Sequence, residues 1–294
     1  MSACPSLRTS LRLLLLANLL VWLLAWALPG YGAVVSLTAP NGREATADYR
    51  PGRADLPAVM IVHGFLQTRE FSTVAALGNT LADAGYTVLA PTLTLNVSRR
   101  KRSLPCEAVH SHTFQMDVDE VSAWTAWLQR KGHQRVVLIG HSHGALAIAA
   151  YLAQPDPVVK QALLLGLYDA EPEFGPGEQA RLMQDLQARA ARQDHSLVTI
   201  PYTFCRRYVG PPAALLSYVR ITRQQVLDWL AASRVPVTVI LGAQDDRVAP
   251  DWLTVLRRQR VEVEVVPGAN HFFDGTSEFD LHDRVLGRLQ RSAN

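Results

Sequence analysis

Short runs of apolar residues alternate along the chain with longer segments whose apolar residues recur at the helical period. The runs 58–62, 135–139 and 237–241 are almost entirely aliphatic, which is typical of strands buried on both faces of a sheet. The segments between such runs, for example 116–131, carry their apolar residues on one helical face. Repeated strand–helix units predict an α/β fold with a mostly parallel central sheet and helices on both faces.

The pattern predicts the following order of elements. The strands are 33–39, 44–49, 57–62, 86–90, 135–139, 162–165, 235–241 and 261–266, and the helices are 71–85, 116–131, 145–153, 178–192, 224–232, 251–260 and 279–290. Pro40-Asn41-Gly42 separates the first two strands and is a hairpin signal. The alternation is interrupted after residue 169, and we interpret residues 170–222 as a cap insertion over the strand ends.

The N-terminal segment has the features of an export signal. Arg8 and Arg12 precede an apolar run over residues 13–28, and Gly30-Tyr-Gly32 follows as a small-x-small site. Cleavage after Gly32 is one interpretation, and an uncleaved anchor is the other, because about 20 apolar residues suffice to span a bilayer. We therefore expect residues 1–32 to be a signal peptide or membrane anchor and residues 33–294 to be exported. The destination is then the periplasm, the exterior or a membrane surface contacted through residues 13–35.

Composition excludes several classes of protein. Of the 294 residues, 48% are hydrophobic and 19% are charged, which excludes a disordered chain and a coiled coil. The net charge is +3, and two of the arginines lie in the N-terminal segment, so we expect no nucleic-acid partner.

Cys106 and Cys205 are the cysteines outside the N-terminal segment. In an oxidising compartment they either form a disulfide or remain two thiols, and no cysteine or histidine spacing indicates a zinc site.

The segment 136–147 carries the most specific chemical signal. Gly140-His141-Ser142-His143-Gly144 matches G-x-S-x-G, with a predicted strand before it and an Ala-rich helix after it. The two glycines are needed because a serine exposed on a tight strand-to-helix turn leaves no room for neighbouring side chains. The following helix directs its positive end at the serine, where an oxyanion would form. This context predicts that Ser142 is a nucleophile.

In this pattern the chain resembles the α/β-hydrolase superfamily, and the resemblance extends over nearly everything after residue 32. A second matching piece is His63-Gly64-Phe65-Leu66, which follows the predicted strand 58–62. The resemblance implies an α/β-hydrolase fold in which the backbone N–H groups of Phe65 and His143 form the oxyanion hole. We interpret His63 as a structural histidine that holds this loop.

A third matching piece is the acid that follows strand 237–241. Asp245 and Asp246 are adjacent there, and the G-x-x-D spacing from Gly242 favours Asp245 as the third member of a triad. Asp246 is the first alternative. Asp169 is the second, because some relatives place the acid after an earlier strand.

The last matching piece is a histidine beyond the final strand. His271 follows the predicted strand 261–266, where the superfamily keeps its general base. The order Ser142, Asp245, His271 is the order found in this fold. The resemblance therefore implies acyl transfer by a serine nucleophile, without a metal or organic cofactor.

Substrate class and partners are less specific predictions. We expect a serine hydrolase that cleaves carboxylic esters or thioesters, with a small-molecule or lipid ester as its partner. A serine peptidase or amidase and a non-catalytic binding protein of the same fold are the alternatives. The basic run Arg99-Arg-Lys-Arg102 is either a cationic rim for acidic substrates or, as we favour, a solvated charge run. His110 and His112 lack a third ligand, and so indicate a metal site only weakly.

Overall fold

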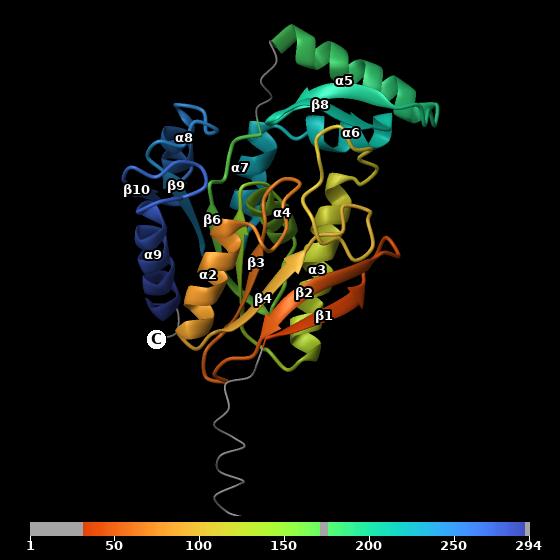
Figure 1. Ribbon diagram of the computed structural model, residues 1–294. Coiled ribbons are helices and arrows are strands. Elements are labelled where there is room, and N and C mark those ends of the chain that lie inside the picture. Colours follow the sequence, from red (N-terminus) through yellow and green to blue (C-terminus); the bar gives the residue numbers. More distant parts are fainter. Residues whose placement is uncertain (1–31, 171–175, 292–294) are drawn as a thin grey trace, which may run out of the picture. The chain divides into compact units, whose positions relative to one another are not determined.

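The computed structural model describes residues 32–170 and 176–291 (Figure 1). Apart from Gly32, the segment expected to be a signal peptide or membrane anchor lies outside these described residues. Within the described ranges, no helix combines the length and the apolar character that crossing a membrane requires.

An eight-stranded sheet organises the described chain. Its spatial order is β1-β2-β4-β3-β5-β6-β9-β10, with β1 and β2 antiparallel to their neighbours and the other strands parallel to one another. The strands are β1 (Ala33–Thr38), β2 (Glu44–Arg50), β3 (Ala58–Val62), β4 (Thr87–Thr92), β5 (Val136–His141), β6 (Val159–Leu165), β9 (Val237–Gly242) and β10 (Glu262–Val266). The predicted mostly parallel sheet is confirmed.

Alternate residues of each central strand enter two different cores. In β3, Ala58, Met60 and Val62 belong to one core, and Val59 and Ile61 belong to the other. This is the geometry expected when a strand is buried on both faces. The aliphatic runs seen in the sequence are continuous because both faces of the sheet are covered.

Helices cover the two faces. α2 (Ser72–Asp83) and α9 (Ser277–Arg291) pack on the face that includes Ile61. Helices that contribute to the core on the other face include α3 (Phe114–Arg130), α4 (His143–Leu152), α7 (Arg223–Ala232) and α8 (Trp252–Arg258). Figure 1 shows α2 in front of the central strands and α4, which is drawn fainter, behind them. The sheet is therefore enclosed by apolar helix faces, and its chemistry lies at the strand ends.

The chain between β6 and α7 is the segment that we interpret from the sequence as an insertion, and we keep that name for it. Its described elements are α5 (Pro176–Ala191), β7 (Val198–Tyr202), β8 (Cys205–Gly210) and α6 (Pro212–Val219). The aromatic and basic segment 202–208 is the end of an antiparallel hairpin formed by β7 and β8, which the sequence did not predict. A disulfide joins Cys205 to Cys106, and the N–H of His110 donates to the carbonyl of Val209 at 2.7 Å. These links attach the hairpin to the loop that follows β4.

The basic run after β4 does not behave as one unit. Arg99, Lys101 and Arg102 are exposed, but Arg100 is buried with 4% of its surface exposed. The expectation of a solvated charge run is therefore wrong for Arg100. Its guanidinium instead bonds to backbone carbonyls of neighbouring loops, which replace the water that a charged side chain normally needs.

Candidate active site

Ser142 lies at the turn between β5 and α4 with an unusual backbone. Its φ is 55° and its ψ is −116°, a backbone conformation that residues other than glycine rarely adopt. A Cβ at Gly140 would lie 2.5 Å from the carbonyl oxygen of Gly144, and one at Gly144 would lie 2.5 Å from that of Val62. Both glycines are thus required by close packing of the backbone, as the pattern G-x-S-x-G predicts. The turn holds the serine hydroxyl at the end of the strand.

Three side chains from separate loops form a hydrogen-bonded chain. His271 Nε2 lies 2.8 Å from Ser142 Oγ, and His271 Nδ1 lies 2.9 Å and 3.0 Å from the two carboxylate oxygens of Asp245. Because an ionised carboxylate only accepts, Nδ1 carries the proton and Nε2 accepts from the serine hydroxyl. The side chains of His271 and Asp245 are 3% and 1% exposed. The arrangement is the one that activates a serine as a nucleophile.

Backbone contacts hold the loops that carry the acid and the histidine. His141 Nε2 lies 3.0 Å from the carbonyl oxygen of His271, so the buried imidazole of His141 donates to the backbone of the histidine loop. Burial lowers the pKa of His141 to about 4, which keeps this ring neutral. In the acid loop, Asp245 Oδ1 accepts from the backbone N–H of Arg247 at 3.0 Å. Both catalytic candidates are therefore positioned by groups outside the chain of three.

The two alternative acids lie elsewhere. Asp246 is exposed and lines the cleft, without contact to His271 in the described structure. Asp169 is buried and forms an ion pair of 2.6 Å with Arg223. The geometry therefore favours Asp245, as the spacing from Gly242 indicated.

Two backbone N–H groups are available near Ser142. His143 is the first residue of α4, and its N–H has no acceptor within the helix. Phe65 follows the turn after β3, and its N–H has no acceptor among the described residues. The rings of Phe65 and His143 pack against each other with centroids 5.4 Å apart. These are the two amides that the family resemblance implied for an oxyanion hole.

A buried polar cluster behind the serine was not expected from the sequence. The imidazole of His143 lies 3.0 Å from the hydroxyl of Tyr168 and 3.4 Å from the carboxylate of Asp117. The hydroxyl of Tyr218 donates to the same carboxylate at 2.7 Å. The sequence offered only a partial signal, because Asp117 lies four residues before the apolar Val121 on the same face of the predicted helix 116–131, while its partner Tyr218 is distant in sequence.

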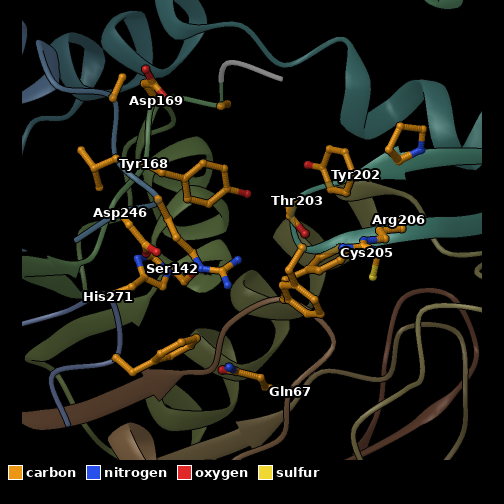
Figure 2. Close-up of a pocket in the computed structure, with 18 of the residues that line it drawn as sticks. Gln67, Ser142, Tyr168, Asp169, Tyr202, Thr203, Cys205, Arg206, Asp246 and His271 are labelled. Atoms are coloured by element: carbon orange, nitrogen blue, oxygen red, sulfur yellow. Dashed lines mark hydrogen bonds between the residues drawn. The ribbon is translucent and has the colours of Figure 1, made fainter. Parts of the chain in front are cut away.

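The cleft in front of Ser142 has a volume of about 650 Å³ and is lined by both the parent fold and the insertion. Figure 2 shows Ser142 and His271 on one side and Tyr202 and Thr203 of the insertion on the other. The hydroxyl groups of Tyr168 and Tyr202 point toward one another across the cleft. Aromatic rings form much of its wall, namely those of Phe65, Tyr168, Tyr202, Phe204 and Phe272.

One cation lies among these rings. The guanidinium of Arg247 is 5.5 Å from the ring centroid of Phe204 and 5.7 Å from that of Phe272. Such distances are typical of cation–π contacts. Arg247 therefore bridges the insertion and the histidine loop at the mouth of the cleft.

The remaining histidines singled out in the sequence are packing residues. His110 is buried, and its ring stacks on that of Tyr208 with centroids 4.3 Å apart. His112 is buried against Tyr218, and burial lowers its pKa to about 4. Among the described residues, no group of three or more His, Cys, Asp or Glu side chains is arranged to hold a metal ion.

Comparison with solved structures shows the same architecture in hydrolases. The chain is similar to Est1E from Butyrivibrio proteoclasticus, which is also known with bound ferulic acid, at 17% sequence identity and a TM-score of 0.62 over 88% of this chain and 98% of that one. It is similar to the alpha/beta hydrolase GrgF from Penicillium sp. sh18, at 14% identity and a TM-score of 0.68 over 89% and 99% of the two chains.

A thioesterase domain from the curacin biosynthetic pathway is also similar, with 18% identity and a TM-score of 0.59 over 89% of this chain and 100% of the domain. At identities this low, the structural similarity demonstrates a shared fold and nothing finer. None of the curated proteins matches the sequence. The sequence profile of the Alpha/beta hydrolase family matches residues 59–278, which include the serine turn, the acid loop and the histidine loop, and the chain therefore belongs to the α/β hydrolase family.

Proposed function

We propose that the protein is a serine hydrolase that cleaves carboxylic esters or thioesters through an acyl-enzyme. The observation that carries the proposal is the unbroken chain from the carboxylate of Asp245 through His271 to the hydroxyl of Ser142, at the floor of an open cleft. A serine hydroxyl is a weak nucleophile by itself and needs a positioned base. A base held in one tautomer by a buried carboxylate supplies that activation.

Acylation begins when Ser142 Oγ attacks the acyl carbon of the ester. His271 Nε2 takes the hydroxyl proton, and Asp245 stabilises the imidazolium that forms. The carbonyl oxygen becomes an oxyanion, which the N–H groups of Phe65 and His143 stabilise, each worth roughly 3–4 kcal/mol. The tetrahedral intermediate collapses, the C–O bond to the alcohol breaks, and His271 returns the proton to the leaving alkoxide.

Deacylation repeats these steps with water as the nucleophile. His271 removes a proton from water as the hydroxide attacks the acyl carbon, and the same two amides hold the second oxyanion. The bond between the acyl carbon and Ser142 Oγ then breaks, and His271 returns the proton to that oxygen. The products are a carboxylic acid and a regenerated serine.

The cleft favours substrates with a flat or apolar group beside the ester. The rings of Phe65, Tyr202, Phe204 and Phe272 offer apolar faces, and the hydroxyls of Tyr168 and Tyr202 offer polar contacts between them. The similarity of the chain to Est1E, which is known with bound ferulic acid, and to a thioesterase domain supports an ester or thioester as the substrate. We therefore propose a small-molecule ester as the partner.

Steady-state hydrolysis of p-nitrophenyl esters tests the proposal. Wild type should release p-nitrophenol, and Ser142→Ala should lower kcat by about 10⁴-fold or more, since the variant lacks the attacking oxygen. Ser111→Ala is the matched control, because this serine is exposed and is not among the residues that line the cleft, and the activity of the variant should equal that of wild type. An aminoacyl p-nitroanilide, assayed beside the ester, tests the amidase alternative. Folded wild-type protein that hydrolyses esters no faster than Ser142→Ala would contradict the proposal.

We further propose that the protein is exported. The disulfide between Cys106 and Cys205 supports this, because disulfides persist in oxidising compartments and are rare in reducing ones. Fusion of residues 1–35 to a reporter enzyme that is active only after export tests the idea. Activity of the fusion, and its absence when residues 13–28 are deleted, is the expected result. An inactive, well-expressed fusion would contradict export.

A further inference from the structure

Arg100 is a buried cation whose direct partners are all uncharged. Its Nε donates to the carbonyl of Leu93 at 2.9 Å, its Nη1 to those of Arg102 at 2.9 Å and Leu66 at 3.3 Å, and its Nη2 to that of Gln67 at 2.6 Å. Burial lowers the pKa of Arg100 to about 10, so the guanidinium stays charged at neutral pH. A buried charge is costly even when hydrogen-bonded, so its position invites a functional explanation.

The same guanidinium determines the state of His63. Nδ1 of His63 lies 2.8 Å from the carbonyl oxygen of Gly64, and a carbonyl only accepts, so Nδ1 carries the proton. Nε2 is then an acceptor, and it receives the backbone N–H of Leu93 at 3.0 Å and Nη2 of Arg100 at 3.2 Å. Burial and the charge of Arg100 lower the pKa of His63 to about 3. The ring is therefore neutral and held in one tautomer.

His63 in turn fixes one peptide group. The carbonyl of Gly64, to which His63 Nδ1 donates, and the N–H of Phe65 belong to the same planar amide. Fixing the direction of the carbonyl therefore fixes the direction of the N–H, which is the proposed oxyanion donor. A hydrogen bond to the carbonyl also polarises the amide and strengthens its N–H as a donor.

Arg100 also binds the part of this turn that follows Phe65. It binds the carbonyls of Leu66 and Gln67, the two residues that follow Phe65. Leu66 has a φ of 58°, a left-handed conformation that is unfavourable for leucine. The turn thus needs external contacts to keep its shape, and the guanidinium contacts it both before and after Phe65.

We propose that Arg100 is a positioning residue of the oxyanion hole, which acts through the neutral imidazole of His63 on the peptide between Gly64 and Phe65. This inference rests on the proposed function, because it assigns a role within the same site. Arg100 touches no reacting atom. Its guanidinium holds the ring of His63, and the ring in turn holds the backbone N–H of Phe65 in one orientation.

The first test reads the histidine directly and does not depend on activity. In full-length protein labelled with ¹⁵N, the ring nitrogens of His63 should report a protonated Nδ1 and an unprotonated Nε2 from pH 5 to pH 8. In Arg100→Gln the ring should begin to titrate or to populate the other tautomer. A wild-type His63 that protonates near its ordinary pKa, or that carries its proton on Nε2, overturns the proposal.

The second test is kinetic. We expect Arg100→Gln to lower kcat for a p-nitrophenyl ester about ten- to a hundredfold with KM within about twofold, because loss of a whole oxyanion donor costs about 10²–10³ in kcat. Arg100→Lys should recover only part of this, since an ammonium cannot reproduce the planar fork. Arg102→Gln is the matched control from the exposed part of the same basic run and should retain wild-type kcat.

A double variant separates positioning from general stability. If Arg100 acts through His63, Arg100→Gln should lower kcat much less in a His63→Ala background than in wild type. Circular dichroism identifies variants that fail to fold, and Arg100→Lys then stands in for Arg100→Gln. An active wild type with unchanged kcat in folded Arg100 variants, or strictly additive effects with His63→Ala, overturns the inference and leaves the proposed function intact. A folded wild type without ester hydrolysis overturns both.

Discussion

The Nδ1 atom of His143 lies 3.0 Å from the hydroxyl oxygen of Tyr168. This contact joins the residue after the proposed nucleophile to a side chain on the wall of the cleft. The other ring nitrogen of His143 faces the buried carboxylate of Asp117 at 3.4 Å. The serine turn is therefore supported from behind by a polar cluster whose members come from α3, α4, α6 and the segment after β6.

Tyr168→Phe should remove one support of this cluster and keep the ring that shapes the cleft. Loss of the hydroxyl leaves a buried nitrogen of His143 without its partner, which costs about 1–3 kcal/mol of unfolding free energy. Urea denaturation followed by circular dichroism measures the change. Ester hydrolysis should stay within about tenfold of wild type, because the position of His143 at the start of α4 still orients its backbone N–H. An unchanged urea midpoint would show that the contact contributes nothing.

The adjacent acids provide a matched pair of variants. Asp245→Asn should lower kcat by about 10⁴-fold, since an amide can stabilise the wrong tautomer of His271 and cannot stabilise its charged form. Asp246→Asn, one residue along, should stay within a fewfold of wild type because that side chain is exposed and does not contact His271. Steady-state rates on one p-nitrophenyl ester decide between them. Equal losses in the two variants, or a larger loss in Asp246→Asn, would contradict the assignment of Asp245.

Removal of the disulfide should destabilise the protein by about 4–5 kcal/mol. Cys106 and Cys205 are 99 residues apart in sequence, and closing so long a loop removes much entropy from the unfolded chain. We expect the double variant Cys106→Ser/Cys205→Ser to unfold at lower urea concentration than oxidised wild type. Reduced wild type serves as the control and should match the double variant. Coincident unfolding curves for oxidised and reduced wild type would rule out a stabilising disulfide.

Stability should fall steeply as the pH drops below 6.5. Burial lowers the pKa of His63 to about 3 and those of His112 and His141 to about 4, so these rings stay neutral in the folded chain and take up protons only on unfolding. Their stabilising contribution is present above pH 6.5 and is lost on acidification, at about 1.4 kcal/mol per pH unit for each ring.

Glu120 acts in the opposite direction. Burial raises its pKa to about 7, so its contribution is complete below the ordinary pKa of 4.5 and is lost as the pH rises through 7. The net slope near pH 5.5 is then about 3 kcal/mol per pH unit. Thermal unfolding between pH 8 and pH 5 measures it, and Glu120→Gln should gain stability relative to wild type at pH 8. A Tm that is constant from pH 7.5 to pH 5 would contradict this account.

Local patterns in the sequence were sufficient for the parent fold and for the three side chains that the structure brings together. Strand β5 and its glycines identify Ser142, and strand ends identify Asp245 and His271, because each signal lies within about ten residues. The same reasoning failed for the hairpin of β7 and β8. Its strands form a separate two-stranded sheet. Its turn has a positive φ of 48° at Thr203, where a glycine would have indicated a turn in the sequence.

Arg100 and Asp117 were missed for a different reason. A charged residue is normally solvated, and nothing local to the sequence says which one of four basic residues enters the interior. Both burials depend on partners that are distant in sequence, such as Leu66 for Arg100 and Tyr218 for Asp117. Long-range hydrogen bonds of this kind become visible only when the chain is folded.

The central claim is that Ser142 is a nucleophile activated by His271. Incubation of the full chain with a fluorophosphonate, followed by peptide mass spectrometry, tests it most directly. The account predicts one covalent adduct per chain, located on Ser142, which is lost in Ser142→Ala and forms far more slowly in His271→Ala. An unmodified Ser142 in folded protein, or an adduct on another residue that persists in Ser142→Ala, would contradict it.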